Sequence, residues 1–307
     1  MTQVVGRKIA RPTRPLADVN VLPKSDGSND IVVCFMPKDP TILVPEGSKA
    51  FLALDASRSL QQMYGAGGVF EVAPNYVQAV ARKLGELLSS VTKSGKVSAI
   101  YWAVSPDGSK IEEIGEFDES GWSQAGIDGP VKQKWGNATK LLPALKHGIE
   151  NVAADGNFTM GVIITDGIIE DEKDCSDYCL RIGKEIADNK RKPVKLILIG
   201  IGKEVDGDQL QRFDDLFEGG GIDIDLFSHG MITSMKEEAD ILGVLYGELI
   251  TDEVIVAPSG SVEDSSGRTL KLYPDGLPAK FRFTLPKGET EFIVRAANQP
   301  EIRQSIV

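Results

Sequence analysis

The sequence contains few side chains that form disulfides or bind soft metals. Only three cysteines and two histidines occur among its 307 residues. An odd and sparse set of cysteines excludes a disulfide framework and is typical of a reducing compartment. Cys175 and Cys179 are four residues apart in a predicted helix, but no cluster of cysteine or histidine completes a zinc site there. We therefore expect the cysteines to be small buried apolar residues.

Basic charge and long apolar runs are also scarce. The chain has 34 lysines and arginines against 45 acidic residues, which gives a formal net charge of -11. Binding to nucleic acid or to an anionic membrane needs a basic surface, so this balance argues against both partners. No segment reaches the ~20 apolar residues of a membrane span. Basic residues near the start, such as Arg7 and Lys8, are not followed by an apolar run, so we expect no secretory signal and a cytoplasmic protein.

Apolar strands alternate with amphipathic helices between residues 46 and 250. Central strands are predicted at residues 50–54, 97–104, 160–165 and 194–201. Near-continuous apolar strands separated by helices are typical of a mostly parallel sheet that is covered on both faces. The pattern therefore predicts a doubly wound α/β domain over residues 46–250.

The periphery of this domain has its own signals. Residues 111–117 are predicted to return antiparallel beside the strand at 97–104, after a Pro-Asp-Gly turn. Pro74 is expected in the first turn of a helix with a clear 3.6-residue period. Ile222, Ile224 and Leu226 alternate with aspartates, which predicts an edge strand.

The two ends of the chain have a different pattern. Residues 1–29 are poor in large apolar side chains and are predicted to form an extended arm, with a strand following at 31–36. After residue 250 the helical pattern stops, and short strands are predicted at 253–257, 268–273, 280–285 and 291–296. So thin a sheet needs a partner layer. We therefore predict that residues 1–45 and 251–307 form a small β-sandwich, with the α/β domain inserted between them.

Five oxygen-bearing side chains lie where strands of the α/β domain end or helices begin. Asp55, Ser57 and Ser59 follow the first central strand, Thr139 precedes a helix, and Asp166 ends the strand at 160–165. Ligands of open α/β sheets gather at the carboxyl ends of the strands, so we expect these residues to meet at one edge. Hard oxygen ligands of this kind suit Mg²⁺.

These motifs resemble the von Willebrand factor A (vWA) domain over about residues 46–250. The vWA domain has a metal-ion-dependent adhesion site (MIDAS) built from Asp-x-Ser-x-Ser, a later Thr and a Thr-Asp-Gly, which here match 55–59, Thr139 and 165–167. Among bacterial members the chain is most similar to the tellurite-resistance-associated subgroup, because Met63-Tyr64 is followed by 67–69, Gly-Gly-Val.

The resemblance implies a binding function without catalysis. Ser57, Ser59 and Thr139 would offer hydroxyls to Mg²⁺, Mn²⁺ or Ca²⁺, and Asp55 and Asp166 would act through bound water and hydrogen bonds. Mg²⁺ takes six oxygens, so a glutamate or aspartate of a partner protein could complete the set. The resemblance also implies a final helix, residues 235–250, that shifts between states of low and high affinity. Arg58 departs from the usual pattern and puts a cation beside the site.

Two other classes of function stay open. A metal with two aspartates at a sheet edge also suits hydrolysis of phosphate esters, although His147 and His229 are the only histidines and no activated Ser or Cys nucleophile is evident. A structural module without a bound metal is the other alternative. The run from Glu170 to Asp174 is predicted to be a solvated helix start, and Gly200-Ile201-Gly202 lacks the third glycine of a dinucleotide site.

Overall fold

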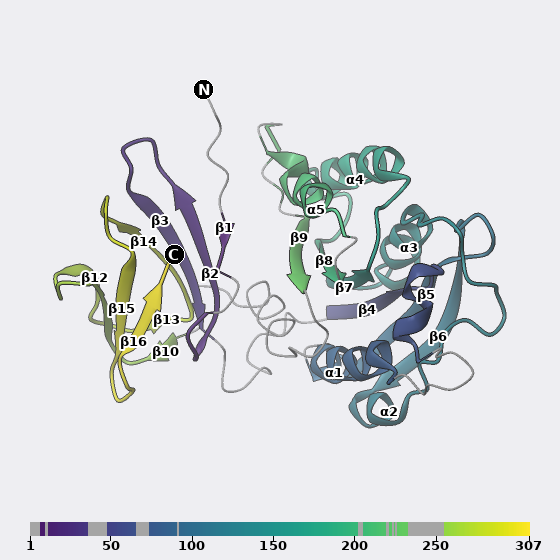
Figure 1. Cartoon of the computed structure of the whole chain (residues 1–307), viewed down its shortest axis with the longest axis horizontal. Coiled ribbons are helices and arrows are strands. Elements are labelled where there is room, and N and C mark those ends of the chain that lie inside the picture. The colour runs from purple at the N-terminus through teal and green to yellow at the C-terminus, as the bar shows by residue number, and fades with distance from the viewer. Residues whose placement is uncertain are drawn as a thin grey trace. The chain divides into compact units, whose positions relative to one another are not determined.

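The computed structural model describes residues 7–9, 12–35, 48–65, 74–90, 92–201, 205–218, 221, 222, 224, 226–232 and 255–307 (Figure 1). The chain divides into two compact units. One is Val44–Glu238, and the other joins Met1–Leu43 with Ala239–Val307. The predicted helix at 235–250 and the Gly-Gly-Val at 67–69 lie outside the described residues. Among the residues that are described, no helix is both long and apolar enough to cross a membrane.

The larger unit is built on a six-stranded sheet with the order β6-β5-β4-β7-β8-β9. Strands β4, β5, β7, β8 and β9 run parallel, and β6 returns antiparallel to β5. The prediction of a mostly parallel α/β sheet is therefore confirmed. The strands are β4 (Ser48–Asp55), β5 (Lys96–Val104), β6 (Lys110–Asp118), β7 (Phe158–Thr165), β8 (Val194–Ile201) and β9 (Phe227–Ile232).

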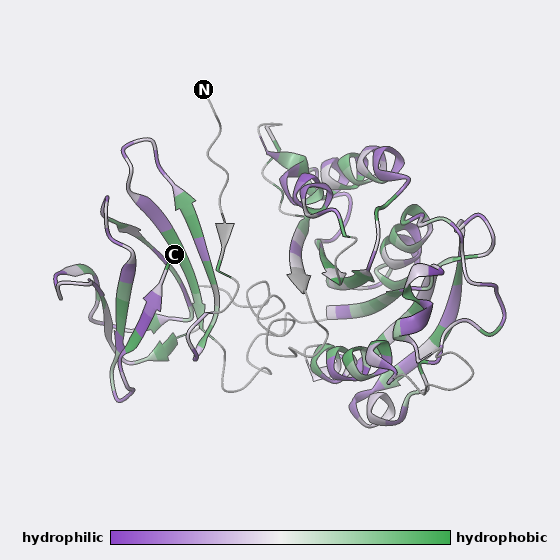
Figure 2. Cartoon of the chain, viewed as in Figure 1, coloured by the Kyte–Doolittle hydropathy of each residue, from purple (hydrophilic) through white to green (hydrophobic). Residues whose placement is uncertain are grey.

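Helices cover both faces of this sheet, with α1 and α2 on one side and α3, α4 and α5 on the other (Figure 1). Hydropathy colouring shows both apolar and hydrophilic residues on the helices (Figure 2), and the buried residues of α1 and α4 recur at helical spacing as an apolar stripe. Such stripes pack on the sheet and leave the polar face to water. The helices are α1 (Tyr76–Ser90), α2 (Glu119–Gln124), α3 (Leu142–Lys146) with a π-helical turn at His147–Val152, α4 (Glu172–Ala187) and α5 (Gly207–Asp214), with 3-10 turns at Ser59–Met63 and Asp215–Phe217.

The ring of Phe51 fills the contact between the sheet and the π-helical turn. An ideal Cβ at Gly148 or at Gly161 would lie 2.2 Å from this ring. Gly148 is in the π-helical turn and Gly161 is in β7. The absence of a side chain at both positions therefore makes the room for Phe51, which is fully buried.

Two predictions about the periphery are wrong. The edge strand is β9, which begins at Phe227, so Ile222, Ile224 and Leu226 precede it. These three residues instead pack on the core of the sheet, and burial alone explains their apolar character. Pro74 lies before α1, which begins at Tyr76, and the Asn75 side chain accepts a hydrogen bond of 2.8 Å from the Gln78 amide.

The second unit consists of short antiparallel strands in three sheets. Their orders are β1-β2-β3-β14, β10-β13 and β12-β11-β15-β16. Strand β14 of the C-terminal region pairs antiparallel with β3 of the N-terminal region over six residue pairs, from Lys280–Cys34 to Leu285–Asn29. The strands are β1 (Arg7–Lys8), β2 (Leu16–Pro23), β3 (Asn29–Phe35), β10 (Ile255–Ala257), β11 (Gly260–Asp264), β12 (Thr269–Tyr273), β13 (Leu277–Pro278), β14 (Lys280–Leu285), β15 (Glu291–Ala296) and β16 (Ile302–Ser305).

Part of the predicted N-terminal arm is a core strand. Leu16, Val19 and Val21 of β2 are buried in one apolar cluster with residues of β14 and β15. The low overall content of large apolar side chains in residues 1–29 concealed this strand, because its apolar residues are confined to a few inward positions. The structure thus corrects the expectation that these residues form no core element.

The three cysteines are free and buried, as predicted. Burial raises the pKa of the Cys179 thiol to about 12. It also raises the pKa of Cys175, whose Sγ donates to Asp171 Oδ1 at 3.5 Å. Thiols of such high pKa are poor nucleophiles and poor metal ligands.

Candidate functional site

Three loops meet at the carboxyl end of β4. The first follows β4 and contains Ser57, which forms a parallel β-bridge with Gly136 of the second loop. The Arg58 amide donates to the Gly136 carbonyl at 2.9 Å, which ties the same two loops again. The third loop follows β7, and β7 pairs with β4. Parallel pairing of β4 and β7 therefore brings Asp55 and Asp166 to the same edge of the sheet.

Asp55 lies at the inner end of the site and has no exposed surface. Its Oδ1 accepts a hydrogen bond of 2.7 Å from the Ser57 amide, and its Oδ2 accepts one of 2.8 Å from the Thr165 hydroxyl. The Tyr64 hydroxyl donates to the Asp55 carbonyl at 2.8 Å. Burial, and after it the charge of Asp166, raises the pKa of Asp55 to about 7.

Ser57, Ser59 and Asp166 form a chain of polar contacts. The hydroxyls of Ser57 and Ser59 share a hydrogen bond of 2.9 Å. The Ser59 hydroxyl donates to Asp166 Oδ1 at 3.0 Å, across 107 residues of sequence. Ser59 is exposed, whereas Ser57 is only 3% exposed. The oxygens thus extend from the interior to the surface of this edge.

Thr139 lies beside the same loop as Asp166. Its Oγ1 is 3.8 Å from an ideal Cβ position at Gly167, the residue after Asp166. The backbone of Thr139 is fixed by Glu170, whose amide donates to the Thr139 carbonyl at 2.9 Å and whose Oε1 accepts from the Thr139 amide at 3.1 Å. The structure thus brings all five predicted residues to one edge of the sheet.

The acidic run at 170–172 leads into the start of α4 at Glu172, as predicted, and its carboxylates also hold loops in place. Both carboxylate oxygens of Asp171 accept backbone amides, from Leu141 at 2.8 Å and from Leu142 at 3.0 Å. Glu172 accepts two hydrogen bonds from Arg212 of α5, at 2.6 and 2.8 Å. The helix start was predicted correctly, but the sequence does not reveal that the segment at 139–142 supplies unpaired amides next to these carboxylates.

Gln209 is a further residue that sequence reasoning missed. It lies in α5 and is 2% exposed. Its Oε1 accepts from the Ile169 amide at 2.7 Å, and its Nε2 donates to the Ile169 carbonyl at 2.8 Å. The only signal in the sequence was a polar residue directly before the buried Leu210, which does not identify a partner 40 residues away.

The five oxygen donors fit a small hard cation. They comprise two carboxylates and three hydroxyls, which is the kind of donor set that Mg²⁺ and Ca²⁺ accept. A cluster of three or more His, Cys, Asp or Glu side chains suited to a metal is absent from the described residues. Burial, and after it the charge of Asp166, raises the pKa of Asp55, and a cation bound near the two carboxylates would favour their ionised forms.

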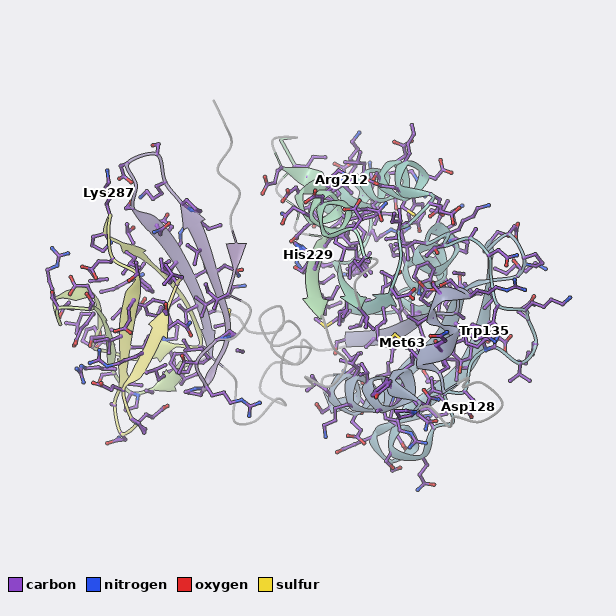
Figure 3. All side chains as sticks on the ribbon, viewed as in Figure 1. Met63, Asp128, Trp135, Arg212, His229 and Lys287 are labelled. Carbon is purple, nitrogen blue, oxygen red and sulfur yellow. The ribbon has the colours of Figure 1, made fainter. Side chains whose placement is uncertain are left out.

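His229 lies apart from this site. The side chain of His229 in β9 contacts Asp214 Oδ2 through Nδ1 at 2.7 Å, and Figure 3 shows His229 and Arg212 well separated from Met63 and Trp135. Trp135 belongs to the second loop, where its ring packs edge-on against Tyr64 at 5.0 Å between centroids. His147 starts the π-helical turn, and burial lowers its pKa. Gly200 lies within β8, so it opens no phosphate-binding turn.

No family model matches the sequence, and no curated protein matches it. Several solved structures are similar at low identity. A von Willebrand factor type A protein from Catenulispora acidiphila has a TM-score of 0.44 and 12% identity over 97% of this chain and 72% of its own. The pilus adhesin SpaC from Lactobacillus rhamnosus GG has a TM-score of 0.43 and 11% identity over 99% of this chain and 50% of its own.

Proximal thread matrix protein 1 from the mussel byssus, described with a zinc-occupied MIDAS motif, is also similar. Its TM-score is 0.42 and its identity 13%, over 67% of this chain and 48% of its own. The chain thus spans about half the length of SpaC and of the mussel protein. Similarity at this level assigns neither a family nor a function.

Proposed function

We propose that this chain is a metal-dependent protein-binding module of the adhesion type. Ser57, Ser59 and Thr139 would bind Mg²⁺, or Mn²⁺ or Ca²⁺, through their hydroxyls, with Asp55 and Asp166 acting largely through water. The observation that supports this most is the pair of contacts made by Ser59, 2.9 Å to Ser57 and 3.0 Å to Asp166. Oxygen donors from distant parts of the chain lie within one hydrogen-bonded group.

The chemistry of the donor set favours binding over catalysis. Three of the five donors are neutral hydroxyls, so a divalent cation would keep much of its charge. Mg²⁺ takes six oxygens, and a glutamate or aspartate from a partner protein could occupy the outward position. Arg58 is exposed between the two serines and would favour an acidic partner surface. His229 pairs with Asp214 away from these loops, so it is not placed to serve as a general base for hydrolysis.

The other unit is proposed to be the β-sandwich that the two chain ends were expected to form. The pairing of β3 with β14 and the apolar cluster that both ends share support this proposal. Residues 46–250 would then be the vWA-like domain inserted between the two ends.

Metal binding is tested by calorimetric titration of Mg²⁺ and Mn²⁺ into the full chain after removal of metals. We expect one site per chain, and we expect the variant Ser59→Ala to bind about 10- to 100-fold more weakly. Ser109→Ala is the matched control, because the Ser109 hydroxyl also donates to an aspartate, Asp107, at 2.7 Å but at another loop. Equal affinity of the Ser59 variant and the control would contradict the assignment, as would the absence of binding by the unmodified chain.

Partner binding is tested by protein capture in Mg²⁺ and in chelator. We expect a partner that is retained only with the metal and is lost when one of its glutamates or aspartates becomes glutamine or asparagine. Metal-dependent hydrolysis of p-nitrophenyl phosphate that disappears in the Ser59 variant would instead support the phosphate-ester hydrolase.

A further inference from the structure

The loop that contains Asp166 is hydrogen-bonded to the side-chain amide of Gln209 in the protein interior. Gln209 bonds both polar backbone groups of Ile169, at 2.7 Å to the amide and 2.8 Å to the carbonyl. Ile169 is 1% exposed and Gln209 is 2% exposed, so water cannot replace either bond readily. Ile169 lies three residues after Asp166, within the same short loop between β7 and α4.

Gln209 is itself held rigidly. Its backbone amide lies 3.1 Å from the side chain of Asp206, the residue that caps α5. Its Nε2 also donates a hydrogen bond to Glu172 at 2.9 Å. Glu172 in turn accepts a hydrogen bond from Arg212, which lies one turn further along α5 (Figure 3). Because the Gln209 side-chain amide is hydrogen-bonded to both Ile169 and Glu172, a displacement of α5 would displace Ile169 as well.

The same loop also positions Thr139. Ile169 is followed by Glu170, which exchanges two hydrogen bonds with the Thr139 backbone, at 2.9 and 3.1 Å. Asp171 then accepts the amides of Leu141 and Leu142. One segment of six residues, 166–171, therefore connects Asp166 and Thr139 to the same anchor on α5.

We propose that Gln209 is a positioning residue for the metal site, which fixes the 166–171 loop through Ile169 and thereby sets the affinity for the divalent cation. This inference rests on the proposed metal binding at Asp55, Ser57, Ser59, Thr139 and Asp166. Glutamine suits this task because one side chain supplies both an acceptor and donors. An apolar side chain of equal length would leave the amide and carbonyl of Ile169 buried without partners.

The test compares Gln209→Met with Gln211→Met in the full chain by calorimetric titration of Mg²⁺. Gln211 is the matched control, because it lies in the same helix and its Nε2 donates at 2.7 Å to Asp215 and not to the loop. We expect Gln209→Met to weaken Mg²⁺ binding by about tenfold, equivalent to about 1.4 kcal/mol, with one site per chain retained. The control should bind as the unmodified chain does.

The outcomes separate the two proposals. If the unmodified chain binds Mg²⁺, Ser59→Ala weakens binding and Gln209→Met binds normally, the role of Gln209 is wrong and the metal site stands. If the unmodified chain binds neither Mg²⁺ nor Mn²⁺, both proposals fail.

A second measurement needs no variant and so does not depend on whether Gln209→Met folds. Coupling is reciprocal, so Mg²⁺ must stabilise the bond between Ile169 and Gln209 as that bond stabilises the metal site. Hydrogen exchange of the unmodified chain should show added protection of the Ile169 amide with Mg²⁺, while amides of β12 in the other unit stay unchanged. An Ile169 amide whose exchange is unaffected by saturating Mg²⁺ would overturn the inference.

Discussion

Two aspartates in Asp-x-Ser turns lie at the carboxyl ends of the neighbouring strands β4 and β5, and their surroundings differ sharply. Asp55 is fully buried, and burial raises its pKa to about 7. Asp107 is exposed, and hydrogen bonds from the Ser105 and Ser109 hydroxyls and the Ser109 amide lower its pKa. The same short motif therefore produces an acid that resists ionisation in one place and an acid that is ionised over the whole physiological range in the other.

The difference arises from the side chains that other parts of the chain place next to each turn. Asp55 receives a hydrogen bond from the Thr165 hydroxyl at the end of β7, and the charge of Asp166 in the loop that follows acts on it. The turn at Asp107 instead supports a neighbouring loop: the Asn137 amide donates to the Pro106 carbonyl at 3.4 Å. The local sequence determines the turn. Residues distant in the sequence determine whether the turn belongs to the candidate site or only stabilises a neighbouring loop.

The largest expected effect is a difference in Mg²⁺ affinity between variants of Asp55 and of Asp107. Asp55→Asn should remove detectable Mg²⁺ binding in calorimetry, because it removes one of only two carboxylates in the donor set. Asp107→Asn should leave the affinity unchanged. Loss of binding in the Asp107 variant, with the Asp55 variant unaffected, would reverse the assignment of the two turns.

The two pKa values predict opposite responses of stability to pH. A carboxyl whose pKa is raised on folding stabilises the folded state below its unfolded pKa, near 3.9, and that contribution is lost as pH rises through about 7. For Asp55 without metal the loss is up to about 4 kcal/mol, at about 1.4 kcal/mol for each pH unit. Asp107 contributes in the other direction, because its lowered pKa stabilises the folded state above its unfolded pKa.

Chemical denaturation in chelator between pH 4.5 and 7.5 measures this response. The difference in the free energy of unfolding between the unmodified chain and Asp55→Asn should change with pH, and saturating Mg²⁺ should reduce that change. A difference that is constant over this range would show that Asp55 is ionised in the folded chain at acidic pH.

The smallest expected effect comes from the support of the Thr139 loop. Gly108 has φ +66°, and an ideal Cβ there would lie 1.9 Å from the Ala138 carbonyl oxygen. Gly95 has φ +65° with no atom within 4 Å of such a Cβ, so Gly95→Ala has the same backbone strain without the clash. Gly108→Ala should be less stable than Gly95→Ala by about 1 to 3 kcal/mol in thermal unfolding and should bind Mg²⁺ more weakly. Equal stability of the two variants would show that the two loops are not in rigid contact.

The sheet of the larger unit was predictable, because buried parallel strands have near-continuous apolar runs. β4, β5, β7 and β8 all have such runs, and each was placed within two residues of its bounds. The eight-residue strand β2 was not predicted, and the edge strand was predicted at residues 222–226 and not at β9. A strand whose inward face has only a few apolar residues, or that lies beside a stronger alternating pattern, gives a weak local signal.

Some residues of the candidate site were likewise predictable from the sequence and others were not. The five oxygen-bearing residues follow from a motif and from the rule that strand ends converge. Gln209, Glu170 and Asp171 could not be found, because their role depends on partners at Ile169, Thr139, Leu141 and Leu142 that no local pattern reveals. Residues that supply a site can be predicted from their spacing, whereas residues that hold it need the contacts themselves.

The packing of Phe51 has a consequence for how this chain can vary between species. Its ring occupies the space that side chains at Gly148 and Gly161 would need. Substitution of either glycine by a larger residue would therefore be tolerated only with a smaller residue at position 51, so the three positions should change together in homologous sequences.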